Sequence, residues 1–245
     1  MSVAAVVFDA YGTLYDVQSV AATTEELYPR AGTLITQLWR LKQLEYTWLR
    51  SQMGAYRDFR RVSEESLAYA LEVAGVEHDR EKVDRIMERY LRLDPYPDAV
   101  EALDALSGTP RAILSNGTPD MLDALVTNTG LADRLEAVIS VDAVRVFKPH
   151  PKAYDLVGER LGARPADVLF VSSNSFDALA ARHHGFRVAW IERVSGPALR
   201  AELDGGFEPG PSTMFKMLRM REEKLGIEVD HRLDALTDLA AIVDP

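Results

Sequence analysis

Short runs of apolar residues without polar alternation recur along the chain. The first run spans residues 5–8 and stops at an acid, Asp9. A strand that is buried on both faces has this pattern, which is typical of parallel sheets. We interpret the later runs as further strands of one sheet, at residues 112–114, 137–140, 168–171 and 188–191, with a short closing element at 231–233.

Segments with helical spacing of apolar residues separate these runs in the second part of the chain. Helices are expected at about residues 98–106, 120–129, 152–161 and 236–243, and one more is expected to end at His184. Strands that alternate with helices in this way predict a doubly wound parallel sheet. The expected fold class is therefore α/β with a Rossmann-like core.

A long stretch after Asp16 interrupts this alternation, because it shows helical periodicity and no convincing strand. A first apolar stripe runs from Leu34 to Met53. A second helix is expected to begin at Ser63, and a third is expected at about residues 83–91. The resulting domains are a core of residues 1–15 and 96–245 and an inserted helical cap of residues 16–95.

A second, smaller excursion from the core is expected at about residues 193–230, where the strand–helix rhythm is lost. Within it, residues 213–223 have the spacing of a helix. We interpret Met214, Met217 and Met220 as packing residues of this excursion rather than as a recognition surface.

The composition restricts the possible functions. The 245 residues carry a net charge of −10, which argues against nucleic acid or an anionic membrane as a partner. The chain has no cysteine, so thiol catalysis, disulfides and cysteine-bound metals are excluded. No stretch approaches the roughly 18 apolar residues of a membrane-spanning helix, and no signal-peptide pattern is present. A reducing cytoplasm is the simplest expected location.

Polar residues follow four of the expected core strands, each after a separate strand. They are Asp9, then Ser115 with Asn116, then Lys148, and finally the stretch 172–177. Each alone could be an ordinary turn residue, helix cap or solvated side chain. Because the carboxyl ends of parallel strands lie on one edge of a sheet, we expect the four groups to converge there.

Together these residues resemble the four motifs of the haloacid dehalogenase superfamily. The matching stretches are residues 9–13, 115–117 and 148–149 and, for the fourth motif, Asp177. Phosphatases of that superfamily have a second aspartate where this chain has Tyr11, and further acids where it has residues 172–174. Since magnesium favours carboxylate oxygens, the resemblance implies a site without a metal or other cofactor.

These departures match one branch of the superfamily, the L-2-haloacid dehalogenases. Longer stretches are also similar to that branch, at residues 38–50, 115–122, 146–151 and 213–216. The resemblance implies hydrolysis of short (S)-2-haloalkanoates to 2-hydroxyalkanoates and halide, through a covalent ester on Asp9. It also implies a homodimer. The alternatives are a phosphatase acting on a small phosphoester and a silent binding relative, which retention of the matched polar residues disfavours.

The resemblance implies roles for the reacting and orienting residues. Asp9 is the expected nucleophile, and Lys148 would hold its carboxylate ionised and stabilise the oxyanion of ester hydrolysis. Asp177 would orient Lys148 and help to activate water. The residues expected to orient this water or the Asp9 carboxylate are Thr13, Ser172 and Asn174.

The remaining implied roles concern the substrate. Ser115 and the amides after it are expected to bind the substrate carboxylate, since a helix begins near Pro119. Arg40 is expected to capture the halide together with Asn116. Leu41 stands where the branch often has glutamine, which bears on substrate range. The residues expected to shape the pocket or lie beside it are Tyr11, Leu44, Phe59, Phe176 and Tyr154.

Overall fold

The computed structural model describes residues 3–205, 210–223 and 225–243. The strands of its main sheet are β1 Ala5–Phe8, β4 Arg111–Ser115, β5 Ala137–Ser140, β6 Val168–Ser172, β7 Arg187–Ile191 and β8 His231–Leu233. Their order is β5-β4-β1-β6-β7-β8, and every neighbouring pair is parallel. All residues of β1 are buried, as its unbroken apolar pattern predicts. The predicted α/β fold class is confirmed.

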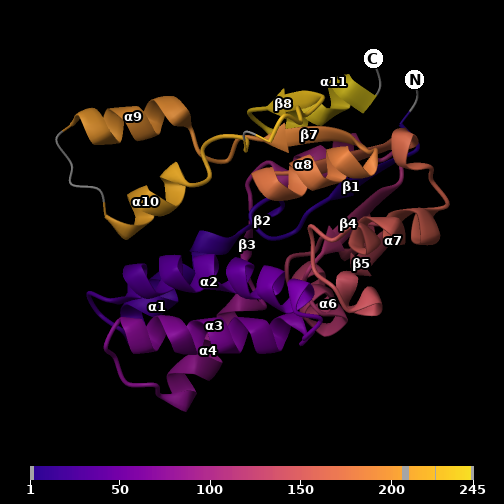
Figure 1. Ribbon diagram of the computed structural model, residues 1–245. Helices are drawn as coiled ribbons and strands as arrows, with labels where there is room; N and C mark the ends of the chain where they lie inside the picture. Colours follow the sequence, from indigo (N-terminus) through magenta and orange to yellow (C-terminus); the bar gives the residue numbers. More distant parts are fainter. Residues whose placement is uncertain (1–2, 206–209, 224, 244–245) are drawn as a thin grey trace.

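Helices precede, connect or follow these strands and pack beside the sheet (Figure 1). They are α5 Ala99–Ala105, α6 Pro119–Asn128, α7 Pro151–Leu161, α8 Ser175–His184 and α11 Leu239–Val243. Each lies where the periodicity of the sequence predicts a helix. Two of them begin close to the polar motifs. Helix α6 begins two residues after Gly117, and α8 begins directly after Asn174.

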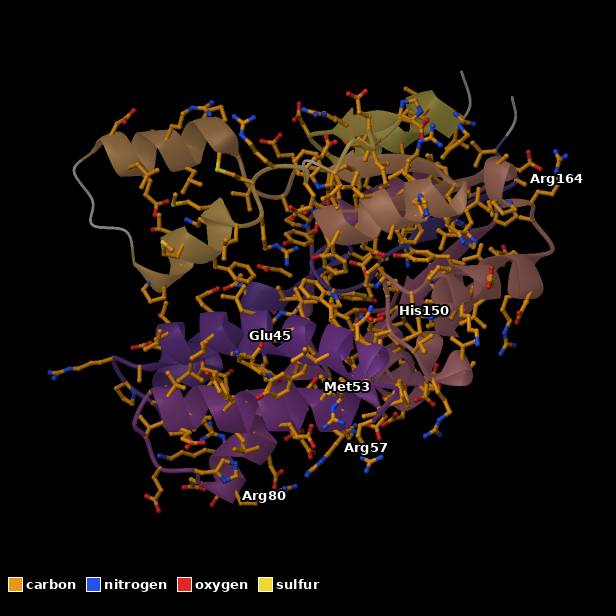
Figure 2. All side chains as sticks on the ribbon, viewed as in Figure 1. Glu45, Met53, Arg57, Arg80, His150 and Arg164 are labelled. Atoms are coloured by element: carbon orange, nitrogen blue, oxygen red, sulfur yellow. The ribbon has the colours of Figure 1, made fainter. Side chains whose placement is uncertain are left out.

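A helical region, α1–α4, follows β1 in the sequence and lies to one side of the sheet (Figure 1). Its elements are α1 Ala21–Leu27, α2 Gly32–Gln52, α3 Phe59–Val73 and α4 Arg80–Tyr90. The chain enters and leaves it through an antiparallel pair of short strands, β2 Tyr15–Asp16 and β3 Asp94–Pro95. Arg57 and Arg80 point outward on the side away from the sheet (Figure 2). Among the described residues no helix has the length and apolarity to cross a membrane.

The predicted start of the second helix of this region, at Ser63, is wrong. Helix α3 begins at Phe59, after Asp58, whose side chain accepts a hydrogen bond from the Arg61 backbone N–H. Serine and aspartate are both good N-cap residues, so the sequence pattern alone did not separate them. Ser63 is instead fully buried inside the helix, with its hydroxyl donating to the Phe59 carbonyl. Helix α1 was not predicted.

The excursion after β7 differs from its prediction in three ways. It contains an unpredicted helix, α9 Gly196–Asp204, and its second helix, α10, spans Pro211–Met217 and so ends before the predicted residue 223. Met214 and Met217 are 51% and 43% exposed, so they do not pack in the excursion as expected. The excursion is instead held to the helical region, because α10 packs against α2.

Candidate active site

The turn after β1 presents Asp9 at the carboxyl edge of the sheet. Its backbone N–H donates to the Val171 carbonyl of the neighbouring strand β6 at 2.9 Å. Thr13 Oγ1 and Asn174 Nδ2 donate to Asp9 Oδ2 at 3.0 and 2.7 Å. Gly12 has φ +92°, a left-handed conformation that favours glycine and allows the tight exit from the strand. Asp9 is thus buried and held with one oxygen between neutral donors.

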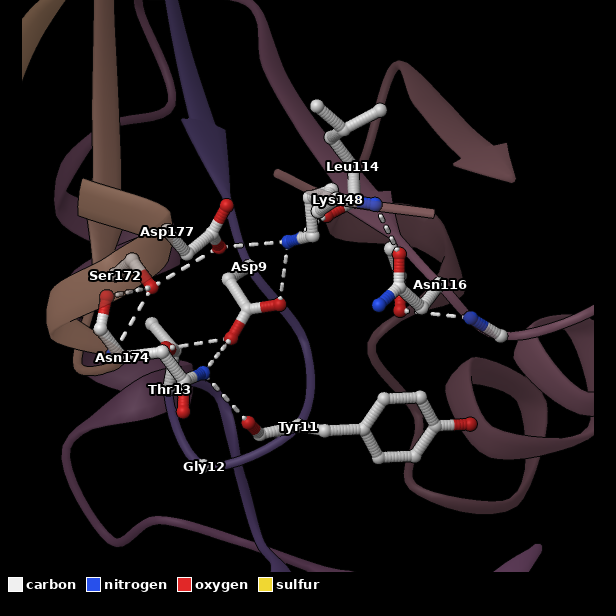
Figure 3. A network of polar contacts seen from close by, with 12 residues as sticks. Asp9, Tyr11, Gly12, Thr13, Leu114, Asn116, Lys148, Ser172, Asn174 and Asp177 are labelled. Carbon is white, nitrogen blue, oxygen red and sulfur yellow. Dashed lines mark hydrogen bonds and ion pairs between the residues drawn. The ribbon is translucent and has the colours of Figure 1, made fainter. Parts of the chain in front are cut away.

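Lys148 bridges the two buried carboxylates of the site (Figure 3). Its Nζ donates to Asp9 Oδ1 at 2.8 Å, to Asp177 Oδ2 at 2.7 Å and to the Leu114 carbonyl at 3.0 Å. Burial alone would favour the neutral amine, but the two carboxylates outweigh it and raise the pKa of Lys148. Lys148 is therefore a buried ammonium whose three protons all have acceptors.

Asp177 lies in the first turn of α8, and its side chain is fixed on both oxygens. Ser172 Oγ donates to Oδ2 at 3.1 Å, and the Tyr154 hydroxyl donates to Oδ1 at 2.7 Å. Burial raises the pKa of Tyr154, so Tyr154 stays a neutral phenol and can donate. Burial also raises the pKa of the Asp177 carboxyl. The structure thereby joins Asp9, Lys148 and Asp177, which come from three separate segments of the chain.

The second motif forms a compact loop ahead of α6. Asn116 Oδ1 accepts from the Lys148 backbone N–H at 2.9 Å, which ties this loop to the third motif. Ser115 Oγ accepts from the Gly117 N–H at 3.2 Å. A Cβ at Gly117 would lie 3.0 Å from the Tyr11 hydroxyl, so glycine permits the close approach of that ring. Among the described residues, the Tyr11 hydroxyl has no hydrogen-bond partner.

Side chains of the helical region close the site from the opposite side. Arg40 of α2 is buried, and it donates to the Tyr90 hydroxyl at 2.5 Å and to Gln43 Oε1. The Tyr11 ring stacks on Tyr90 with centroids 5.3 Å apart, and it tilts against Phe59 at 5.4 Å. An aromatic wall therefore lies beside the nucleophile turn.

For several residues that are predicted to bind the substrate or shape the pocket, the contacts do not define a role. Among the described residues, Arg40 and Asn116 share no hydrogen bond, and each bonds to other partners. Phe176 is partly buried and meets the edge of Trp48, with centroids 5.2 Å apart. Leu44 is partly buried one helical turn after Arg40. The roles of these residues at the pocket stay predictions.

Arg219, which the sequence analysis missed, supplies a further cation next to the nucleophile turn. Its Nη2 donates to Ser173 Oγ at 3.3 Å, and that hydroxyl donates to the Gly12 carbonyl at 2.6 Å. Burial and the neighbouring Arg40 lower the pKa of Arg219 to about 10, so it remains charged at neutral pH. Together with Gly12 and Phe215 it lines a cavity of about 360 Å³.

The donor set does not suit a metal ion. Among the described residues, no three His, Cys, Asp or Glu side chains are grouped so that they could hold one. Between Asp9 and Asp177, where carboxylates could share a cation, Lys148 Nζ already contacts both. The metal-free site, expected because Tyr11 and residues 172–174 stand where phosphatases have acids, stays a prediction.

Comparisons with known proteins identify the class. Residues 3–185 match the family model of the haloacid dehalogenase-like hydrolases. The chain is 57% identical over 98% of its length to the (S)-2-haloacid dehalogenase of Xanthobacter autotrophicus, covering 94% of that protein. It is 45% identical to an enzyme of the same name from Pseudomonas putida, over 78% of this chain and 85% of that enzyme.

Solved structures agree with this result. The L-2-haloacid dehalogenase from Xanthobacter autotrophicus superposes with a TM-score of 0.94 at 56% identity, over 98% of both chains. A second structure of it, with chloropropionic acid covalently bound, has a TM-score of 0.93 over the same shares. The chain therefore belongs to the haloacid dehalogenase-like hydrolases. Within that class it is a member of the L-2-haloacid dehalogenase family.

Proposed function

We propose that this protein hydrolyses short (S)-2-haloalkanoates to 2-hydroxyalkanoates and halide, with Asp9 as the nucleophile. The observation that carries the proposal is the buried Asp9–Lys148–Asp177 arrangement beside the aromatic wall of Tyr11. The names of the similar enzymes support the substrate class, and the covalently bound chloropropionic acid in one of them supports a covalent intermediate.

In the first step, a carboxylate oxygen of Asp9 attacks C2 of the substrate from the side opposite to the halogen. The new C–O bond forms as the carbon–halogen bond breaks, the halide leaves with the electron pair, and C2 is inverted. Asp9 becomes a neutral ester. One negative charge thus moves from Asp9, beside Lys148, to the departing halide.

The charges of the site suit this transfer. Lys148, Arg40 and Arg219 are the cations around the site, and Asp9 and Asp177 are the two carboxylates that contact Lys148. The site therefore has a net positive charge that favours a small monoanionic substrate. We propose that Arg40 stabilises the leaving halide, and that Ser115 with the N–H groups that start α6 binds the substrate carboxylate.

In the second step, water attacks the carbonyl carbon of the Asp9 ester. The oxyanion that forms lies beside Lys148, whose charge stabilises it. Asp177 accepts the proton that the water loses, and its burial-raised pKa suits this role. Collapse of the oxyanion breaks the ester bond, and the second proton of the attacking water passes to the leaving alkoxide oxygen, which restores the Asp9 carboxylate and releases the 2-hydroxyalkanoate. Asp177 then gives its proton to solvent before the next turnover. Thr13, Ser172 and Asn174 orient the reacting groups.

Halide release should persist in the presence of a metal chelator. The expected result is equal turnover of (S)-2-chloropropionate with and without excess chelator, because the Lys148 ammonium already lies between the two carboxylates and contacts both. A halide-selective assay measures this, with the R enantiomer as the control substrate. Phosphate release from small phosphoesters that requires magnesium, without halide release, would support the phosphatase alternative instead.

We also propose that the chain forms a homodimer through an apolar surface where α2 meets α10. A cavity of about 380 Å³ is lined there by Leu34, Leu38, Leu41 and Met214, and Leu34 and Met214 are 41% and 51% exposed.

The cytoplasm stays our prediction for the location of the protein in the cell.

Light scattering tests the dimer. The measured mass of the wild-type protein should be twice that of one chain. Leu41→Glu should shift the measured mass toward that of one chain, since a charge would enter the apolar surface. Val100→Glu on α5 is the matched control, because Val100 and Leu41 are both 37% exposed. A single-chain mass for the wild type would contradict the proposal.

A further inference from the structure

The contacts of Arg40 are unusual for a buried guanidinium. Arg40 is 2% exposed, and among the described residues no carboxylate pairs with it. Its side-chain partners are both neutral, the Tyr90 hydroxyl and Gln43 Oε1. Its Nε has no partner among the described residues. The guanidinium thus keeps its full positive charge and has unused donor capacity, which suits an anion.

The orientation of the Gln43 amide is determined by its surroundings. Ser63 Oγ donates to the Phe59 carbonyl at 2.7 Å, so its oxygen is left to accept a hydrogen bond. Gln43 Nε2 donates to that oxygen, which turns Gln43 Oε1 toward Arg40. The Tyr90 hydroxyl, which accepts from Arg40, also donates to the same Oε1 at 3.3 Å. Helices α2, α3 and α4 together therefore fix one acceptor on Arg40.

From these contacts we infer that Gln43 is a positioning residue for halide departure. It orients Arg40 with a neutral acceptor and leaves the positive charge of the guanidinium free for the halide. A carboxylate at this position would orient Arg40 equally well but would neutralise it. The inference rests on the proposed function, in which Arg40 stabilises the leaving halide. It adds a residue that acts through Arg40 and does not touch the substrate.

The choice of leaving group separates this role from a structural one. Chloride is a poorer leaving group than bromide, so its departure depends more on stabilisation by Arg40. A weaker Arg40 should slow the release of chloride more than the release of bromide. A general loosening of the site should slow both to the same extent. The ratio of the two rates therefore reports on the halide step itself.

The experiment compares Gln43→Glu with the wild-type protein in single-turnover halide release from (S)-2-chloropropionate and (S)-2-bromopropionate. We expect chloride release to slow by about 10- to 100-fold and bromide release by clearly less. Gln37→Glu is the matched control, because Gln37 is another buried glutamine of α2 and bonds to Gln18 instead of Arg40. It should leave the rate ratio unchanged.

Gln43→Met keeps the test valid if the glutamate variant does not fold. Methionine is neutral and of similar size, but it removes the acceptor from Arg40, so the rate ratio should move in the same direction by a smaller amount. Equal slowing of both substrates in the Gln43 variants would overturn the inference alone. A wild-type protein that releases neither halide would overturn the proposed function and the inference with it.

Discussion

Replacing Asp9 by asparagine is expected to abolish steady-state dehalogenation. The neutral amide cannot displace halide, and loss of a nucleophile that acts with its neighbours costs at least about 10⁴-fold in turnover. The amide is also mismatched to the site. Its N–H₂ group would face either Lys148 Nζ or the donors of Thr13 and Asn174, so at least one donor would point at another donor. Halide release over many turnovers measures the loss.

A labelling experiment tests whether Asp9 carries the covalent intermediate. In a single turnover in ¹⁸O-water, the label should enter the Asp9 carboxylate, because water attacks the carbonyl carbon of the ester. Mass spectrometry of the peptide that contains Asp9 detects it. Label found in the 2-hydroxyalkanoate, with none on Asp9, would contradict the covalent mechanism. Asp16→Asn is the control variant for Asp9→Asn. Asp16 caps the short helix after β2, so the same change there should leave turnover unchanged.

The core of the fold was predictable because its strands have an unambiguous sequence pattern. The run at residues 5–8 has no alternation, and all four residues are buried in a central parallel strand. Helix α9 escaped prediction because it belongs to the irregular stretch after β7, where the alternation of strands and helices gave no guide to its position. Helix boundaries failed where two residues could cap equally well, as with Asp58 and Ser63. In that case burial of the helix face decides, and burial depends on tertiary packing.

The site was predictable where its residues follow strands and less so where they lie inside helices. Asp9, Lys148 and Asp177 lie in the segments that follow β1, β5 and β6, so the sheet topology brings them to one edge of the sheet. Gln43 and Tyr90 lie within α2 and α4, where a polar residue usually faces solvent. One signal did exist. Gln43 is three residues after Arg40, a spacing at which side chains on a helix are neighbours.

Replacing Lys148 by methionine is the second change for which we expect a large effect. It removes the only charge that the contacts place between Asp9 and Asp177 in the described structure, and it leaves two buried carboxylates facing each other. Loss of one partner from a buried ion pair costs about 3–5 kcal/mol of unfolding free energy. Turnover should fall by at least about 10³-fold, since oxyanion stabilisation is lost as well. Urea unfolding and halide release measure the two effects.

The double variant Lys148→Met with Asp177→Asn separates stability from catalysis. Removing one buried negative charge should restore most of the free energy of unfolding, whereas activity should stay lost. The single Lys148→Met variant should regain stability as the pH falls. Burial raises the pKa of the Asp177 carboxyl, so the folded protein binds a proton at a pH where the unfolded chain does not. Stability therefore decreases as the pH rises through that window. A Lys148→Met protein with wild-type turnover would contradict the role of this ammonium in the reaction.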